Sequence, residues 1–337
     1  MTREGLGRSD VEIVMVPRER YSATLESLRH VLATVPGDVK VTLVKGGMPN
    51  RTVRRVKALA RGRVEVVGPS RHLAPNAARS IGLRSVAARF VVFVDNDIIP
   101  SRGWLEALTS AAEAHDAWAV RPLILQRVRD RVTVHDAGGD CHLEQKGAVT
   151  TLVESHRHLG RTLDEAGPLQ PGPTELFEFH TVLFNRARLQ DVGGPDERML
   201  SQGEHLDLAL RVRSAGGSVW FIPDSQVTYL IPDRLSVRDL PFFLGRWSPS
   251  WNAASRRAFC AKHAVSELSD PCNTWRYPDF HRTSAWIPAG RLASQLLRRP
   301  IERRLAQRFD RILGRRIADA VLRLAPRWRG GGLEVPH

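Results

Sequence analysis

Residues 90–100 read FVVFVDNDIIP, a continuous apolar strand that runs directly into two acids separated by one residue. An uninterrupted apolar strand is typical of a parallel sheet that helices cover on both faces. Ligands of such sheets bind beyond the carboxyl ends of the strands. Asp95 and Asp97 are therefore predicted to stand at the ligand-binding edge of a sheet.

The Asp95-Asn96-Asp97 turn is a candidate metal and nucleotide site. Two carboxylates one residue apart can direct oxygens to a common point, where a hard divalent cation would relieve their repulsion and carry a diphosphate. Acids are also ordinary residues in the turn after a strand, which is the competing interpretation. A predicted amphipathic helix from Gly103 places the acids between two well-formed elements and favours the site.

The chain before residue 90 alternates strand-like and helix-like segments. Apolar runs predict strands at 11–16, 41–44 and 64–67. Periodic apolar spacing predicts helices at 21–34, 53–60 and 76–88. This order predicts an α/β fold with a mostly parallel central sheet and helices on both faces.

A second polar group lies in the segment GEHLDLALR at 203–211. In a helix, Glu204 and Asp207 share a face, whereas His205 is offset by about 100°. Acids at a helix N-terminus also complement the helix dipole, so capping without catalysis is the alternative for this segment alone.

Four motifs in this order resemble the family 2 glycosyltransferases of GT-A fold, within the nucleotide-diphospho-sugar transferase superfamily. They are VEIVMVP at 11–17, APNAARSIGL at 74–83, FVVFVDNDIIPSRGWLEAL at 90–108, and the segment that begins VGGPDERMLSQGEHLDLALR at 192–229. The resemblance covers about residues 11–230. It implies a GT-A domain at 11–235, with a nucleotide-sugar half at about 11–120 and an acceptor half at about 121–235. We expect residues 1–10 to be a flexible N-terminus and 236–337 a helical extension.

The resemblance implies transfer of a sugar from a nucleotide-diphospho-sugar donor to an acceptor hydroxyl on a glycan, a lipid-linked molecule or a small molecule. Asp97 and Asp95 would hold Mg²⁺ or Mn²⁺, which stabilises the negative charge of the leaving diphosphate. The expected donor contacts are Pro17, Arg79, Asp95, Asn96, Asp97, Arg246 and Trp247.

The sequence departs from the family pattern at the expected base. His205 stands where the family usually has the second acid of a Glu-Asp pair. A neutral imidazole also accepts a proton near pH 7, so His205 is a candidate base that Glu204 or Asp207 would orient. Glu204 as the base, a metal-ligand role for His205 and a structural histidine remain open.

Two other departures concern the metal and the nucleotide. The family's metal-binding histidine would fall near Thr228 or Tyr229, so that ligand is missing or replaced. His180, which precedes an apolar strand, is a candidate metal ligand, and a buried structural histidine is the alternative. Lys45-Gly46-Gly47 stands where the family commonly has an aspartate that contacts the nucleotide base, so the nucleotide is not predicted.

Arg246 and Trp247 form half of the Gln-x-x-Arg-Trp motif of processive family members, in which Arg meets phosphate and Trp stacks on the acceptor sugar. Phe243 stands at the Gln position, and we expect Phe242 and Phe243 to pack in the core.

Much of the net charge of +14 lies near the C-terminus, because residues 291–337 hold 12 arginines and four acids, a net charge of +8. Apolar residues recur there with helical period, and arginines flank them. The apolar positions are Leu297, Ile301, Leu305, Phe309, Ile312, Leu313, Ile317, Val321 and Leu324. From about residue 291 this predicts a basic amphipathic helix that binds an anionic membrane surface, packs on the domain or pairs with a second subunit. Nucleic acid is a minor option because no recognised nucleic-acid-binding motif accompanies it.

Composition indicates the cellular compartment that we expect and bears on two alternative functions. The three cysteines form no Cys-x-x-Cys pair, and residues 1–10 lack the apolar stretch of a signal peptide, so we expect a cytoplasmic protein that can lie peripherally at the inner face of the membrane. A sugar nucleotidyltransferase would carry a Gly-rich loop after its first strand, and VPRERYSATLESL at 16–28 has no glycine. A non-catalytic nucleotide-sugar-binding protein is the other alternative.

Overall fold

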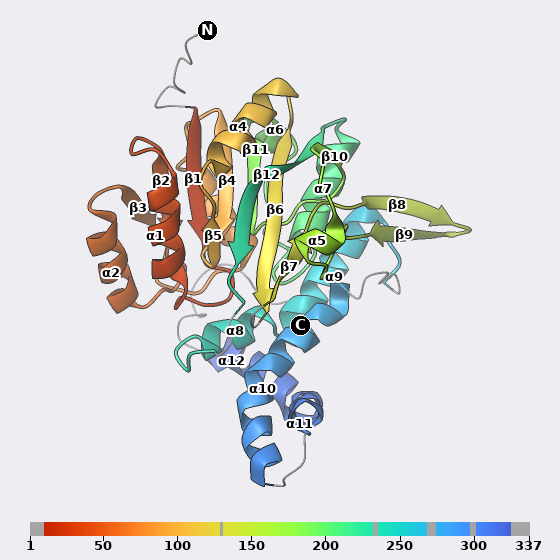
Figure 1. The fold of residues 1–337 in the computed structure, drawn as a ribbon. Helices are drawn as coiled ribbons and strands as arrows, with labels where there is room; N and C mark the ends of the chain where they lie inside the picture. Colours follow the sequence, from red (N-terminus) through yellow and green to blue (C-terminus); the bar gives the residue numbers. More distant parts are fainter. Residues whose placement is uncertain (1–9, 129–130, 232–234, 268–273, 297–300, 325–337) are drawn as a thin grey trace.

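A ten-stranded sheet forms the centre of the computed structural model, which describes residues 10–128, 131–231, 235–267, 274–296 and 301–324. The strand order is β10-β12-β6-β11-β4-β1-β2-β3, with β5 paired to β12 and β7 paired to β6. The strands are β1 Val11–Val16, β2 Lys40–Val44, β3 Val64–Val67, β4 Phe90–Asp95, β5 Ile98–Pro100, β6 Ala119–Val128, β7 Arg131–Asp136, β10 Gly172–Thr174, β11 Thr181–Asn185 and β12 Val219–Tyr229. A hairpin of β8 (Cys141–Lys146) and β9 (Val149–Glu154) projects from the side of the molecule (Figure 1).

The sheet is parallel in its first half and mixed in its second. Strands β3, β2, β1 and β4 run parallel, in agreement with the alternation of strands and helices. Strand β11 then lies between β4 and β6 and is antiparallel to both, while β12 is parallel to β6. Hydrophobic spacing identifies a strand but not its direction, so the sequence did not predict this reversal.

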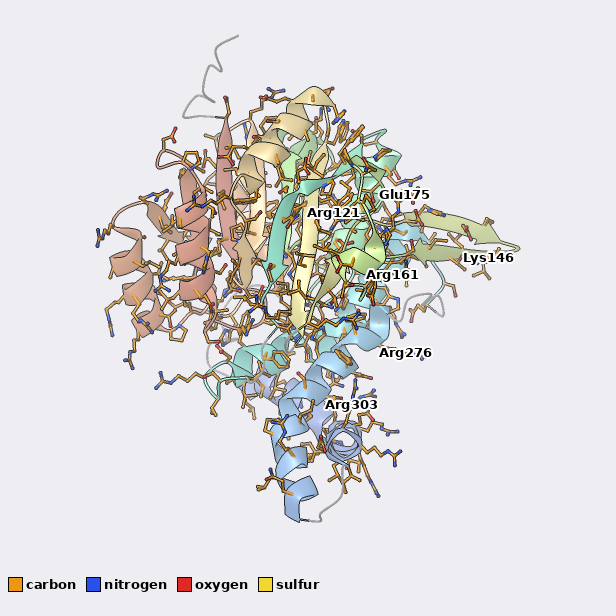
Figure 2. The ribbon with its side chains drawn as sticks, in the orientation of Figure 1. Arg121, Lys146, Arg161, Glu175, Arg276 and Arg303 are labelled. Carbon is orange, nitrogen blue, oxygen red and sulfur yellow. The ribbon has the colours of Figure 1, made fainter. Side chains whose placement is uncertain are left out.

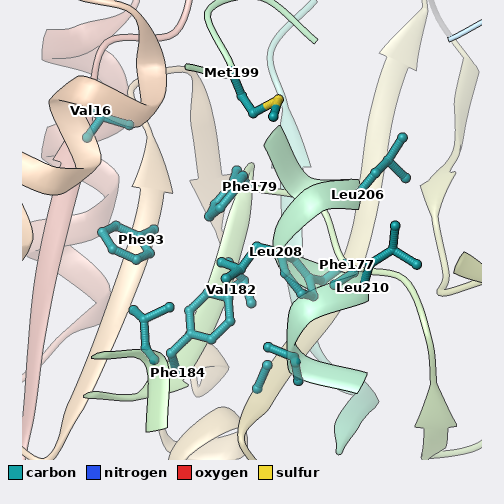
Figure 3. Close-up of a cluster of buried hydrophobic side chains, with 14 of the residues drawn as sticks. Val16, Phe93, Phe177, Phe179, Val182, Phe184, Met199, Leu206, Leu208 and Leu210 are labelled. Carbon is teal, nitrogen blue, oxygen red and sulfur yellow. The ribbon is translucent and has the colours of Figure 1, made fainter. Parts of the chain in front are cut away.

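Helices cover both faces of the sheet. On one face lie α1 (Thr24–Thr34), α2 (Asn50–Ala60) and α4 (Trp104–Ala114), and on the other α3 (Pro75–Leu83), α6 (Arg186–Asp191), α7 (Glu204–Ser214) and α9 (Pro249–His263). A single-turn helix, α5, spans Leu163–Ala166. Strand β1 shows the alternation, because Ile13 packs toward the first group and Val14 toward the second. Figure 3 shows the hydrophobic core between the sheet and the second group of helices, where Phe93 and Val182 of the sheet meet Leu208 of α7.

Helix α3 ends at Leu83, earlier than the predicted end at residue 88. The side chain of Glu12 on β1 accepts hydrogen bonds from the backbone amides of Ala87 (2.9 Å) and Ala88 (3.0 Å). These bonds draw the chain back to the sheet. The helix therefore stops one and a half turns early, because the backbone groups find partners on β1 instead of in a continued helix.

Gly82 allows α3 to lie directly against β1. A Cβ atom at this position would lie 2.2 Å from Cγ1 of Val14, closer than any tolerated contact. The close approach directs the preceding turn of α3, which carries Arg79, toward the end of β4.

The helices after β12 gather at the edge of the sheet toward which β6 and β12 point (Figure 1). They are α8 (Leu240–Arg246), α9, a short 3₁₀ turn at Thr274–Arg276, α10 (Tyr277–Leu296), α11 (Glu302–Phe309), a π turn at Asp310–Gly314 and α12 (Arg315–Leu324). Arg282 of α10 is fully buried and contacts both carboxylate oxygens of Asp310 at 2.7 and 2.8 Å. It also donates to the backbone carbonyl of Trp247, so one guanidinium joins α8, α10 and the π turn.

The apolar stripe expected near the C-terminus is divided between the interior and the surface. The side of α11 and α12 that packs inward consists of small or polar residues, namely Ala306, Asp310, Gly314 and Ala318. Leu305, Ile317 and Val321 are half-buried, whereas Phe309, Ile312, Leu313 and Leu324 are exposed. Leu297 lies outside the described residues. Among the helices that the structure describes, none has both the length and the apolar composition of a membrane span.

Candidate active site

A cavity of about 450 Å³ opens at the carboxyl ends of the strands. Its buried part is formed by charged residues of β4, α3, α7 and α8, among them Asp95, Arg79, Glu204 and Arg246. Residues of α10 and of the segments after β9 and β12 complete its wall. Together with His205, five of the residues predicted from the sequence therefore line one cavity.

Asp95, Asp97 and His180 form the group of described residues that could hold a metal ion, with their ligand atoms all within 4.8 Å of one another. Both carboxylate oxygens of Asp97 and both ring nitrogens of His180 are buried and make no hydrogen bond with the described part of the chain. Asp95 differs, because Arg79 donates to one of its oxygens at 3.2 Å. Arg20 lies 3.9 Å from an oxygen of Asp97, and Nδ1 of His180 lies 3.4 Å from an oxygen of Asp95, so these atoms have charged neighbours but no described hydrogen bond. Buried polar atoms without hydrogen bonds are costly unless something binds them.

The charges at this group are consistent with cation binding. Burial raises the pKa of Asp97 to about 7 and that of Asp95 to about 6, although nearby arginines oppose the shifts. Burial lowers the pKa of His180 well below its ordinary value, so its imidazole is neutral and offers a lone pair. Two desolvated carboxylates and a neutral imidazole are suitable ligands for a divalent cation. The residues present therefore fit the metal that the motifs imply.

Arginines surround the cavity beside this group. Arg79 donates to Asn76 and Asp95, and its guanidinium lies 3.7 Å from the ring centroid of Phe179. Arg246 donates to Glu204 at 2.7 Å. Arg18, Arg79 and Arg246 each keep one buried N–H group without a hydrogen-bond partner among the described residues. Convergent guanidinium donors suit a diphosphate.

Four expected donor contacts do not line the cavity: Pro17, Asn96, Asp97 and Trp247. Of the candidate metal group, only Asp95 lines it, because Asp97 and His180 are buried beside it. The amide of Asn96 is used within the protein: it donates to the backbone of Arg20 and to Thr24, and it accepts from the backbone N–H of Arg18. Trp247 is fully buried, because it donates to Glu19 at 2.9 Å and stacks on His281 at 4.2 Å. Pro17 is not among the residues that line the cavity.

His205 lies in the cavity wall between two carboxylates. Its Nε2 atom is 3.5 Å from Glu178 and 3.9 Å from Glu154. Burial would lower the pKa of His205, but Glu178 and then Glu154 outweigh it, so the pKa is raised. The imidazolium form of His205 is therefore more favoured than that of an ordinary histidine, whereas the neutral imidazole is the form considered from the sequence.

The two acids of the same helix have different environments. Burial opposes ionisation of Glu204, but Arg246 and Arg79 lower its pKa, and its second oxygen has no described hydrogen-bond partner. Asp207 does not line the cavity. Its carboxylate contacts Arg211 at 2.7 Å, Lys262 at 2.8 Å and His263 at 2.9 Å, contacts that join α7 to α9.

The sequence did not lead us to expect three parts of the cavity: Glu178, Glu154 and the residues of α10. Glu178 lies two residues before His180, so its position beside a candidate ligand was the available signal. Glu154 ends β9, and no pattern in the sequence connects that strand to α7.

Residues 12–155 match the family model described as Glycosyl transferase family 2. A crystal structure of GalNAc-T7 with UDP, GalNAc and Mn²⁺ has a TM-score of 0.52 at 17% identity, covering 82% of this chain and 55% of that one. The chain therefore has the fold of GT-A glycosyltransferases, and its residues 12–155 are similar to family 2. The mannosyltransferase PcManGT from Pyrobaculum calidifontis, in complex with GDP-Man and Mn²⁺, shares this fold with a TM-score of 0.50 at 16% identity, covering 97% of this chain and 77% of that one.

Curated relatives match the GT-A domain at low identity. The pre-mycofactocin glycosyltransferase of Mycobacterium tuberculosis is 27% identical over 235 residues, which are 70% of this chain and 45% of that protein. A probable N-acetylgalactosaminyltransferase 9 of Caenorhabditis elegans is 28% identical over 159 residues, 45% of this chain and 26% of that protein. The chain thus spans less than half the length of these relatives.

His180 lies beside the position near the end of β12 where the GT-A resemblance places a histidine. Tyr229 occupies that position, and its ring centroid is 4.3 Å from that of His180. The candidate ligand therefore comes from the residue before β11 instead of from β12.

Proposed function

We propose that this protein transfers a sugar from a nucleotide-diphospho-sugar to an acceptor hydroxyl, with a divalent cation, Mg²⁺ or Mn²⁺, held by Asp95, Asp97 and His180. The observation that carries the proposal is the set of buried ligand atoms on Asp97 and His180 that make no described hydrogen bond, beside the arginine-lined cavity. The family match and the fold support it.

On the donor side, Arg18, Arg79 and Arg246 bind the diphosphate with the N–H groups that lack partners. The bound cation supplies Lewis-acid stabilisation of charge on the leaving group. Arg79 also hydrogen-bonds Asp95, so it fixes the carboxylate while facing the cavity. The related structures hold UDP or GDP-Man, and we propose a uridine or guanosine diphosphate sugar as the donor.

On the acceptor side, His205 is the base we propose. In its neutral form it accepts the proton of the acceptor hydroxyl, and Glu178 at 3.5 Å stabilises the imidazolium that results. Glu204 remains the alternative base, because it is a cavity carboxylate with a lowered pKa and a second oxygen free of described hydrogen bonds.

The proposal is tested by release of nucleoside diphosphate from a panel of UDP- and GDP-sugars, with Mn²⁺ and with excess EDTA. We expect release from at least one donor with Mn²⁺ and none in EDTA. Binding of the nucleoside diphosphate without release in any donor and acceptor combination would instead indicate a non-catalytic binding protein. Undiminished turnover in EDTA would contradict the role of the cation.

A further inference from the structure

Building on the proposed function, we infer that the acceptor carries its reactive hydroxyl on an apolar body, which a collar of four side chains at the cavity mouth binds. The collar consists of Leu159, Ile231, Tyr277 and Phe280, all of which line the cavity. No glycosyltransferase motif includes these residues.

The collar differs sharply from the rest of the cavity in exposure. Its members are 47%, 37%, 42% and 60% exposed, in the order Leu159, Ile231, Tyr277 and Phe280. The charged residues deeper in the cavity, such as Asp95 and Arg246, are at most 2% exposed. The cavity therefore has a buried charged floor and a mouth at which these four large side chains stand beside polar ones such as the exposed Ser284. Large apolar side chains gathered at a cavity mouth mark a binding surface more often than side chains scattered singly.

Several contacts hold the collar in place. Tyr277 and Phe280 meet edge to face on α10 with ring centroids 6.5 Å apart. Arg303 of α11, labelled in Figure 2, lies 5.8 Å from the ring centroid of Phe280. His281, the residue after Phe280, stacks on the buried Trp247 and anchors α10 to α8. Tyr277 and Phe280 are thus positioned before any acceptor arrives, which lowers the entropic cost of binding.

The chemistry of the collar selects the class of acceptor. Leu159 and Ile231 offer no hydrogen bonds, so they do not satisfy the hydroxyls of a glycan. An acceptor with an aromatic or alkyl body buries that body against the collar and directs its hydroxyl to the floor. There the hydroxyl oxygen forms a bond to the anomeric carbon, the bond from that carbon to the diphosphate oxygen breaks, and the proton passes to the base.

The experiment uses matched probes on the full-length protein with Mn²⁺ and the nucleoside diphosphate bound. Methyl, p-nitrophenyl and octyl glycosides of glucose, galactose, mannose and N-acetylglucosamine, below their micelle concentrations, are titrated by calorimetry and tested as acceptors. The collar variant combines Ile231→Ser and Phe280→Ser. The matched control is Leu292→Ser, since Leu292 lies on the same helix, is also 60% exposed and does not line the cavity.

We expect the p-nitrophenyl or octyl probes to bind at least about tenfold more tightly than the methyl probes, as burial of one ring or chain against an apolar surface predicts. The collar variant should reduce that ratio to about threefold or less, while the control retains it. Preference for octyl over p-nitrophenyl would identify a lipid-like body, and the reverse a planar aromatic body.

Equal binding of the three probes, or a ratio unchanged in the collar variant, would overturn the inference. Metal-dependent release of nucleoside diphosphate from the donor is measured in parallel. If that release is intact in the collar variant while the preference is absent from wild type, only the acceptor class is wrong. If release and nucleotide binding are both absent, the proposed transferase function fails instead.

Discussion

Asp97 and Asp207 are both fully buried carboxylates, yet their surroundings give them opposite effects on stability. Burial raises the pKa of Asp97 to about 7, so without metal its charged form costs stability above that pH. For Asp207 burial is outweighed by His263, Arg211 and Lys262, which lower the pKa, so its charge contributes stability that is lost only as pH falls.

The same substitution at the two positions therefore has opposite expected results. At pH 8 in EDTA, Asp97→Asn should raise Tm by a few degrees and Asp207→Asn should lower it by several degrees. Asp97→Asn should also reduce donor turnover at least about a hundredfold, because a cation ligand is lost. Differential scanning calorimetry and the release assay measure both effects. A lower Tm for Asp97→Asn would show that its carboxylate has a stabilising partner.

His205 gives a pH dependence that separates the two candidate bases. Glu178 and Glu154 raise its pKa above the ordinary value of about 6.5, and Glu204 acts in the same direction. The neutral imidazole, which is the form that accepts a proton, predominates only above this raised pKa. The ascending limb of kcat/KM should therefore lie above pH 6.5, and His205→Asn should lower the rate by about a hundredfold.

Glu178→Gln is the positioning control for this profile. Removing that carboxylate removes the interaction that raises the pKa of His205 most. The ascending limb of kcat/KM should therefore still be present but should move to lower pH. A profile that is flat above pH 6, together with inactivity of Glu204→Gln and full activity of His205→Asn, would assign the base to Glu204.

At the residue scale, the sequence predicted what local motifs determine. Asp95 and Asp97 lie at the end of β4, and Glu204 begins α7, so these acids belong to local motifs that the sequence displays. Trp247 could not be placed, because its partner Glu19 is 228 residues away and only the fold brings them together.

At the element scale, Gly82 determines how closely α3 approaches the sheet. Alanine is ordinarily favoured over glycine in a helix by about 1 kcal/mol. Here its methyl group would overlap Val14, and relieving such overpacking costs about 1–3 kcal/mol. Gly82→Ala should therefore lower the free energy of unfolding and, by displacing Arg79, weaken binding of the nucleoside diphosphate.

Gly37→Ala is the matched control, because a Cβ there would have no atom within 4 Å. Urea denaturation and nucleotide titration compare the two variants. Equal stability of both would mean that α3 shifts away from β1 without cost.

Strand and helix positions in the first hundred residues agree with the predictions to within a few residues, because hydrophobic period and turn residues are local signals. The antiparallel insertion of β11 and the early end of α3 depend on contacts between segments distant in sequence. Those contacts leave no periodic signal.

At the scale of the whole molecule, the helices after β12 both complete the cavity and carry a cationic surface. Helix α10 supplies Tyr277 and Phe280 to the collar, and the π turn that follows α11 is held to α10 by the buried ion pair of Arg282 and Asp310. A chain truncated before α11 would leave Arg282 buried without this partner, so truncation would test folding as well as binding. Point substitutions on the exposed side are the cleaner probe.

Binding of this surface to an anionic membrane stays a prediction, and the structure sharpens it. Phe309, Ile312 and Leu313 are exposed beside Arg308 and Arg311. An exposed apolar helix face flanked by arginines is typical of helices that lie among anionic headgroups. Each basic residue near such a surface contributes about 1 kcal/mol. The protein should therefore sediment with phosphatidylglycerol vesicles at low salt, and less at high salt because ions screen the attraction.

Arg308→Gln with Arg311→Gln should weaken the partition coefficient by about thirtyfold. The control, Arg51→Gln with Arg54→Gln, removes the same charge from the exposed side of α2 and should change it little. Equal loss in both double variants would show that net charge, not the α11 surface, governs binding, and no sedimentation of wild type would leave Phe309, Ile312 and Leu313 to another partner.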